Sequence, residues 1–102
     1  MARADSARGI ARERALVKML RSQGYVAMRA PASLGVFDVI AVKDGRIRLI
    51  EVKSTTRSAW SGFLPADRAA LLDAAQTAGA EAELCWWPKH RKPTFLTPDE
   101  WP

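Results

Sequence analysis

The sequence predicts an α/β protein in which a mixed β-sheet is flanked by helices. Two segments, 6–23 and 65–78, carry helix-forming residues and are each followed by a glycine. Short runs rich in β-branched and aromatic residues lie between and after these segments, at 25–30, 36–42, 46–54, 82–87 and 94–96. The predicted order is therefore helix, three strands, helix and one or two strands, with the helices packed on the sheet.

The first helix is predicted over residues 6–23, with Ser6 as its N-cap and Gly24 just past its end. At 100° per residue, one face carries an apolar stripe of Ile10, Leu16, Val17 and Leu20. Glu13 falls near the middle of that stripe and should face the sheet, where an unpaired charge would cost several kcal/mol. Two readings are open: Glu13 pairs with Arg29 or Arg14, or it joins other acids around a metal ion.

The strongest local signal is the dipeptide Asp44-Gly45, which predicts a two-residue hairpin turn between strands 36–42 and 46–54. Such a turn places Lys43 opposite Arg46, and the same register sets Asp38 opposite Glu51. Lys53 lies on the same face, because side chains alternate with a period of two. This face is therefore apolar near the turn and charged at its far end.

Two opposed carboxylates, with Cβ atoms about 4.5–5.5 Å apart, repel each other. At an effective dielectric constant of ~20 the repulsion is roughly 3 kcal/mol. A cation, a shared proton or solvation would relieve it, and carboxylate and carbonyl oxygens are ligands that Mg²⁺ or Mn²⁺ prefers. The alternative is a solvated strand end in which Lys53 pairs with an acid.

In the second half, Pro65 is predicted to open a helix over about 65–78 that Gly79 ends. Strand 82–87 follows, and PKHRKP forms a turn before the short strand 94–96. The pattern of residues 55–63 favours no single element, and the final TPDEWP is expected to be a tail.

The positive charge is concentrated at the N-terminal end. Residues 1–29 contain seven Lys or Arg and two acids, whereas residues 30–102 contain nine of each, so the net charge of +5 belongs to the first part. An excess of this kind indicates binding to a polyanion such as nucleic acid. A solvated basic helix face is the alternative.

Composition excludes several classes. With 102 residues, 48% of them hydrophobic, the chain is expected to be one domain over 1–102, with a basic arm at about 1–8. No apolar run is long enough to span a membrane, and no signal peptide is seen, so we expect no membrane partner and a cytoplasmic protein. One cysteine, Cys85, and one histidine cannot build a zinc site or an internal disulfide. No glycine-rich phosphate loop is present, so no nucleotide cofactor is expected.

The hairpin carries FD, twelve residues and then EVK, which resembles the PD-(D/E)xK signature of metal-dependent nucleases. The surrounding string ARERALVKMLRSQGYVAMRAPASLGVFDVIAVKDGRIRLIEVKS resembles the archaeal-type Holliday junction resolvase family. That family shows a glutamate-arginine pair in the first helix, RAPAS before the aspartate, and an IEVK or IEMK strand. The likeness runs from about Gly9 to Ser54 and continues loosely to Trp87. It implies a restriction-endonuclease-like fold.

The resemblance also implies roles for individual residues. Asp38, Glu51 and the Val52 carbonyl would bind Mg²⁺, or Mn²⁺, and Glu13 would complete the metal site directly or through water. Lys53 would orient or help deprotonate the attacking water. Arg29 and Ser33 would contact the scissile backbone or support the catalytic site.

We expect nucleic-acid contacts from one hydroxyl residue and a set of arginines that includes the arm: Ser33, Arg3, Arg8, Arg12, Arg14, Arg29 and Arg57. Two positions depart from the family pattern. Phe37 stands where the motif usually has a proline, and Arg68 stands where the second helix often carries a glutamine. The second departure affects how water or phosphate would be positioned.

Six large aromatic residues lie in the second half of the chain, and adjacent Trp86 and Trp87 must point to opposite faces of their strand. So many aromatics predict an exposed apolar patch, against which either a second subunit or nucleobases would pack; ordinary core packing in a monomer is the alternative. The resemblance implies a two-fold homodimer. We expect its interface to include Leu84, Trp86, Trp87 and Phe95.

The sequence therefore predicts a hydrolase: a structure-selective endonuclease that resolves four-way DNA junctions during recombination and repair. One alternative is another PD-(D/E)xK nuclease, of a repair or restriction type. The other is a non-catalytic nucleic-acid-binding domain with the same fold.

Overall fold

The structure is a computed structural model that describes residues 7–31 and 35–102, with the side chains of Ala7 and Arg8 left out. Its elements, in chain order, are α1 (Ala7–Ser22), β1 (Val26–Arg29), β2 (Val39–Lys43), β3 (Arg46–Lys53), α2 (Pro65–Ala78), β4 (Glu81–Trp86), β5 (Thr94–Leu96) and the 3-10 helix η1 (Pro98–Glu100). The predicted α/β class and element order are confirmed. Ser6, the predicted N-cap, lies outside the described residues.

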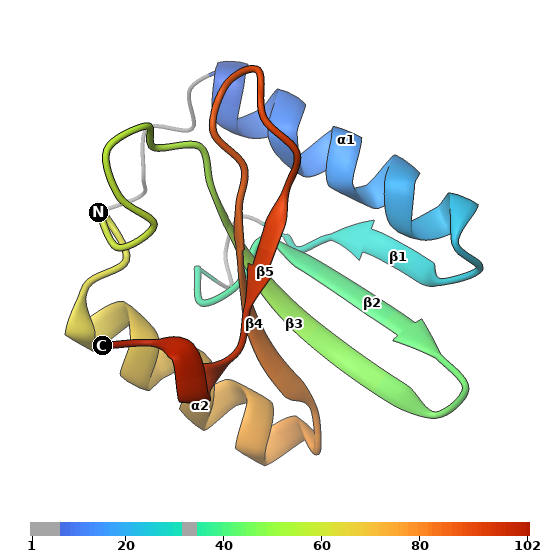
Figure 1. Ribbon diagram of the computed structural model, residues 1–102. Coiled ribbons are helices and arrows are strands. Elements are labelled where there is room, and N and C mark those ends of the chain that lie inside the picture. The colour runs from blue at the N-terminus through green and yellow to red at the C-terminus, as the bar shows by residue number, and fades with distance from the viewer. Residues whose placement is uncertain (1–6, 32–34) are drawn as a thin grey trace.

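The five strands form one mixed sheet in the order β1-β2-β3-β4-β5. Strands β3 and β4 are parallel and the other neighbouring pairs are antiparallel. The connection between the two parallel strands contains α2, as such crossovers require. Figure 1 shows α1 lying along β1 and β2, while α2 lies below β4 on the other side of the sheet.

Each helix covers its own apolar core. Leu16, Val17 and Leu20 of α1 pack with one face of the sheet, which includes Val39 and Ile50. The opposite face packs against α2 through a second cluster of Leu49, Phe63, Leu71, Ala75, Ala82 and Leu84. The predicted stripe of α1 thus faces the sheet, and Glu13 is buried within it, at 8% exposure.

The β2–β3 hairpin has the predicted turn and register. Asp44 (φ 52°) and Gly45 (φ 77°) both adopt positive φ, as a type I′ turn requires. Lys43 pairs with Arg46, and the ladder continues in that register to Val39 and Ile50, where it ends. The predicted strand start at residue 36 is therefore wrong by three residues, and Asp38 and Glu51 are not a ladder pair.

The C-terminal residues fold back on the domain instead of forming the expected tail. A capping box between Thr97 and Glu100 caps the N-terminus of η1. Trp101 then packs edge-on against Phe63, with ring centroids 5.0 Å apart, and its indole N–H donates to the Leu96 carbonyl (3.0 Å). The sequence pattern does not predict this packing because Phe63, the residue that Trp101 contacts, is distant in sequence.

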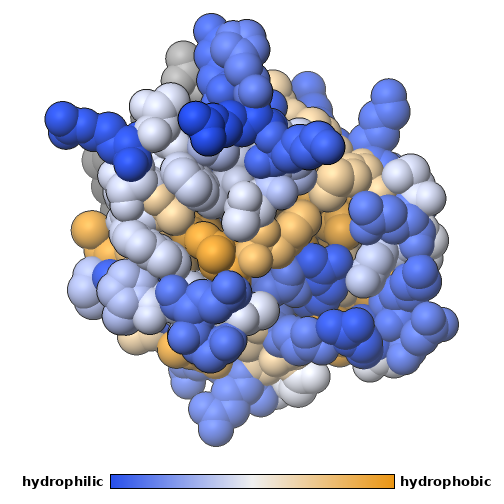
Figure 2. Space-filling view, in the orientation of Figure 1, coloured by the Kyte–Doolittle hydropathy of each residue, from blue (hydrophilic) through white to orange (hydrophobic). Residues whose placement is uncertain are grey.

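The aromatic side chains expected at the surface are partly buried by their own chain, and all four tryptophans have intermediate exposure. The large apolar side chains that are exposed are aliphatic: Val26, Met28, Leu64 and Leu72. Figure 2 shows apolar surface in the middle of one face, bordered by hydrophilic side chains.

Two arginine–glutamate pairs join β3 to β4. Arg48 and Glu83 make two hydrogen bonds of 2.6 Å, and their side chains are only 11% and 6% exposed. Arg46 and Glu81 make the same bidentate pair at 2.9 and 2.8 Å, with side chains 61% and 50% exposed. The two pairs have the same chemistry and differ mainly in burial.

We predict that Glu83→Ala destabilises the fold by about 3–5 kcal/mol, because it leaves the buried Arg48 guanidinium without its partner. Glu81→Ala is the matched control, and its exposed pair should be worth less than about 1 kcal/mol. Urea denaturation of both variants measures the difference. Equal losses of unfolding free energy would contradict the assigned role of burial.

Candidate functional site

The candidate site lies where β2 begins and β3 ends. Asp38 immediately precedes β2 and is 4% exposed, while Glu51, on β3, is 6% exposed. The Asp38 carboxylate accepts a hydrogen bond through Oδ2 from the main-chain N–H of Val52, at 2.8 Å. This bond joins two of the predicted metal-site residues.

The main chain of Asp38 is fixed from both sides. Its N–H donates to the Ile50 carbonyl (2.9 Å), and its carbonyl accepts from the Ala30 N–H (2.8 Å). Ile50 is also the ladder partner of Val39, so Asp38 and Val39 both oppose one residue of β3. This irregularity resembles a β-bulge, which redirects a side chain at the end of a strand. It replaces the predicted face-to-face carboxylates.

Lys53 lies beside one of the buried acids. Its Nζ is 3.5 Å from Glu51 Oε2, and the two side chains are 16% and 8% exposed. The Lys53 carbonyl accepts a hydrogen bond from the Trp87 N–H at 2.7 Å. An ammonium group and two carboxylates are therefore held largely away from bulk water, where electrostatic interactions are stronger than at a surface.

Glu13 pairs with one of its two predicted arginine partners. Arg29 Nε donates to Glu13 Oε1 at 3.0 Å, which joins α1 to the end of β1. Within residues 7–31 and 35–102, no group of three or more His, Cys, Asp or Glu side chains could by itself hold a metal ion. The two buried carboxylates at the strand ends are those of Asp38 and Glu51.

 A hydroxyl-lined pocket follows directly after Lys53. Its volume is about 330 Å³. The pocket is lined by Ser54, Thr55, Thr56, Arg57 and Ser61. The indole N–H of Trp86 donates to the Thr55 carbonyl at 2.7 Å and so ties this segment to β4. Hydroxyl and guanidinium donors of this kind suit a phosphate group.

The predicted nucleic-acid contacts separate into groups. Arg14 and Arg57 are exposed, and Arg29 is held by Glu13. Arg12 instead stacks on Trp87, 5.0 Å from the ring centroid, and donates to the Pro88 carbonyl (3.2 Å), so part of its guanidinium is used within the fold. Arg3 and Ser33 lie outside the described residues, as does the side chain of Arg8.

The predicted interface residues are also partly used by the chain itself. Leu84 is fully buried in the core, so its side chain cannot contact a partner. Trp86, Trp87 and Phe95 are half-buried, and the Trp87 indole N–H donates to the Arg91 carbonyl (2.8 Å). The prediction for Leu84 is corrected, whereas the other three residues keep some exposed surface.

Cys85 is not suited to nucleophilic chemistry. It is fully buried, and burial, followed by the charge of Glu83, raises the pKa of its thiol to about 12. A thiol that stays protonated is a poor nucleophile. His90, the single histidine, is exposed in the turn between β4 and β5.

Two features of the surface were missed from the sequence. Lys18 and Arg21 line the groove between α1 and β1 together with Arg14, and their spacing of four and seven residues from Arg14 could have indicated a shared helix face. The hydroxyl groups around Arg57 gave no sequence signal, because short polar loops are common.

The fold and the site together define the class. A five-stranded mixed sheet with a helix on each face, and buried acids followed by a lysine at the strand ends, is the arrangement that the PD-(D/E)xK signature implies. The family model for the archaeal Holliday junction resolvases (Hjc) matches residues 4–101, and the chain belongs to this family.

Individual proteins that are similar to this chain are also Hjc proteins. The chain is 47% identical over 55 residues to the crossover junction endodeoxyribonucleases Hjc of Sulfurisphaera tokodaii and Sulfolobus acidocaldarius; each match covers 49% of this chain and 38% of the relative. The chain thus matches well under half the length of these relatives. The structure of Archaeoglobus fulgidus Hjc, a Holliday junction resolvase, is similar with a TM-score of 0.70 and 25% identity, over 85% of this chain and 73% of that one. No helix in residues 7–31 and 35–102 is long and apolar enough to cross a membrane.

Proposed function

We propose that the chain is a metal-dependent endonuclease that resolves four-way DNA junctions by hydrolysing phosphodiesters in opposed strands. The observation that carries the proposal is the placement of Asp38, Glu51 and Lys53, which lie at adjoining strand ends and are nearly buried. Membership of the resolvase family supports the choice of junction DNA as substrate.

The donor set fits a hard divalent cation. Asp38, Glu51 and the Val52 carbonyl would supply oxygen ligands to Mg²⁺ or Mn²⁺, and Glu13 would take part through water. Mg²⁺ commonly binds one or two carboxylates and completes its shell with water and substrate phosphate, so three protein carboxylates in direct contact are not needed. When bound, the metal would polarise the phosphate and lower the pKa of bound water.

The chain's own residues would do the remaining work. Lys53, next to Glu51, would orient the attacking water and stabilise the negative charge that develops on the phosphate. Arg29, held by Glu13, would bind the scissile backbone. Arg57 and the surrounding hydroxyl groups would hold a neighbouring phosphate.

We predict that Asp38→Asn and Glu51→Gln abolish cleavage of a synthetic four-way junction in magnesium but retain junction binding. The asparagine side-chain oxygen can still accept the Val52 N–H, so the fold should survive the loss of charge. Denaturing gels measure cleavage, and fluorescence anisotropy measures binding. Asp44→Asn is the matched control, since asparagine tolerates its positive φ.

Several outcomes would contradict the proposal. Near-normal cleavage by either variant would exclude the metal site. Equal cleavage of linear duplex by the unmodified protein would favour another nuclease of this fold. Binding of the junction without cleavage in magnesium or manganese would favour a non-catalytic binding domain.

For Lys53→Ala we predict a fall in single-turnover rate of ~10²-fold or more, the range for one acid–base or electrostatic group. Lys89→Ala, at an exposed turn, is the control. Junction affinity should change little. An unaltered rate at saturating magnesium would leave Lys53 with only a structural role beside Glu51.

We further propose a two-fold homodimer, since two opposed incisions require two sites and each chain supplies one. An isologous interface would bury the same surface twice and relate the sites by its axis. Trp86, Trp87 and Phe95 remain the predicted contacts, because each keeps exposed surface.

Light scattering should give a dimer mass for the unmodified protein at micromolar concentration. Trp87→Arg should weaken the dimer, whereas Leu72→Arg, which adds a charge at an exposed position of α2, should not. A monomer both free in solution and on the junction would defeat the dimer proposal.

A further inference from the structure

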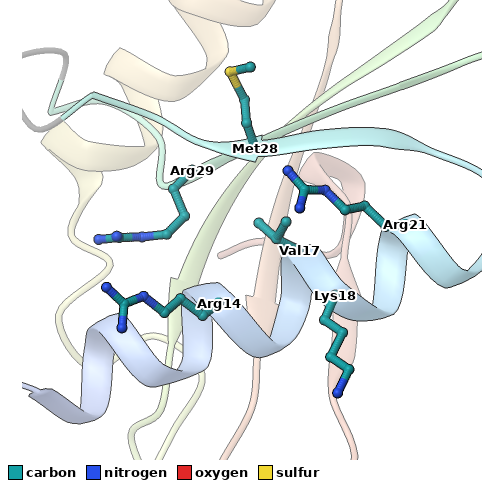
Figure 3. A pocket seen from close by; sticks show the side chains of 6 residues that line it. All are labelled: Arg14, Val17, Lys18, Arg21, Met28 and Arg29. Carbon is teal, nitrogen blue, oxygen red and sulfur yellow. The ribbon is translucent and has the colours of Figure 1, made fainter.

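A groove of about 410 Å³ lies between α1 and the edge strand β1. Figure 3 shows the guanidinium groups of Arg14 and Arg29 near one end, with Lys18 and Arg21 farther along the helix. Its complete lining is Arg14, Val17, Lys18, Arg21, Met28 and Arg29. Four of these six side chains are cationic and none is acidic.

The charges in the groove are mostly uncompensated within the described structure. Arg29 pairs with Glu13, but no described carboxylate forms an ion pair with Arg14, Lys18 or Arg21. By contrast, Arg46 and Arg48 on the sheet are each held by a glutamate. Three of the four cations in the groove therefore have no described acidic partner.

The three helix cations share one face because they stand at positions i, i+4 and i+7. Like charges at this spacing destabilise a helix by a few tenths of a kcal/mol per pair. Arg21 is additionally fixed to β1, since its Nε donates to the Ala27 carbonyl at 3.0 Å. An external anion would offset the repulsion.

The groove has the length of a short stretch of DNA backbone. Seven residues of helix from Arg14 to Arg21 span ~10.5 Å at 1.5 Å per residue. One DNA strand carries a phosphate about every 3.4 Å of helix axis, so a duplex with its axis along the groove would bring roughly three phosphates of one strand past it. Val17 and Met28 add apolar surface that suits the carbon face of deoxyribose.

The groove also leads away from the candidate site. Arg29 precedes Ala30, whose N–H donates to the Asp38 carbonyl (2.8 Å), so this end adjoins the buried acids. Arg21 contacts β1 two residues earlier, at Ala27. A strand bound near Arg29 could thus continue along α1.

We propose that this groove binds the backbone phosphates of a DNA arm next to the cleavage site, with Lys18 and Arg21 as additional phosphate contacts. This inference rests on the proposed function for the identity of the DNA, but not for its charge and shape. Lys18 and Arg21 would contribute to affinity and not to the hydrolytic step.

The test is the salt dependence of junction binding, measured by anisotropy in EDTA. If both side chains contact phosphate, K18Q/R21Q should reduce the slope of log K against log salt by about two units, at ~0.9 per contact. The same relation gives a loss of affinity on the order of 50-fold near 0.1 M salt.

Two controls separate position from charge. K89Q/K92Q removes two cations from the β4–β5 turn and should change the slope by less than half a unit. K18R/R21K keeps both charges and should keep the slope. Because Arg21 also bonds β1, K18Q alone provides a second test that disturbs no described hydrogen bond, with an expected change of about one unit.

A slope for K18Q/R21Q equal to that of K89Q/K92Q would overturn the proposed groove. Failure of the unmodified protein to cut the junction would instead overturn the proposed function. If that protein binds duplex DNA and K18Q/R21Q lowers the slope, the groove would stand even without junction cleavage.

Discussion

The hydrogen bond from the Val52 N–H to the Asp38 carboxylate is the interaction on which the rest of the site depends. The β2–β3 ladder ends at Val39 and Ile50, and a buried main-chain N–H beyond that point needs another acceptor. The Asp38 side chain supplies it. The same bond holds the Asp38 carboxylate against the main chain of Val52, the residue that follows Glu51.

The charged side chains of β3 and β4 are paired with one another, whereas most of the cations described on α1 have no described acidic partner. On β3 and β4, arginines and glutamates neutralise one another, and the buried Arg48–Glu83 pair joins parallel neighbours. On α1, Glu13 and Arg29 form one pair, while Arg14, Lys18 and Arg21 lie on the outer groove with no described acidic partner. The sheet is thus internally balanced, whereas the helix presents positive potential that can attract a polyanion.

The parallel pairing of β3 with β4 fixes the end of β3 that carries Lys53. It sets Trp86 opposite Lys53, and the Trp86 indole N–H holds the Thr55 carbonyl two residues past the end of β3. Trp86, a predicted subunit contact, therefore also fixes the loop that follows Lys53. Trp87, on the other face, contacts Arg12 and so joins the end of β4 to α1.

The sequence by itself determined the helices, the hairpin and the family. The end of α2 at Gly79 and the turn at Asp44-Gly45 follow from residue types that tolerate positive φ. The burial of Glu13 follows from its position on the apolar face of the helix. These are local rules that act within a few residues. Tertiary structure alone decided that Glu13 pairs with Arg29, that Asp38 bonds to Val52 and that Trp101 packs on Phe63. Those contacts join segments whose approach is set by the packing of helices on a common sheet, and no local spacing specifies which partners that packing brings together.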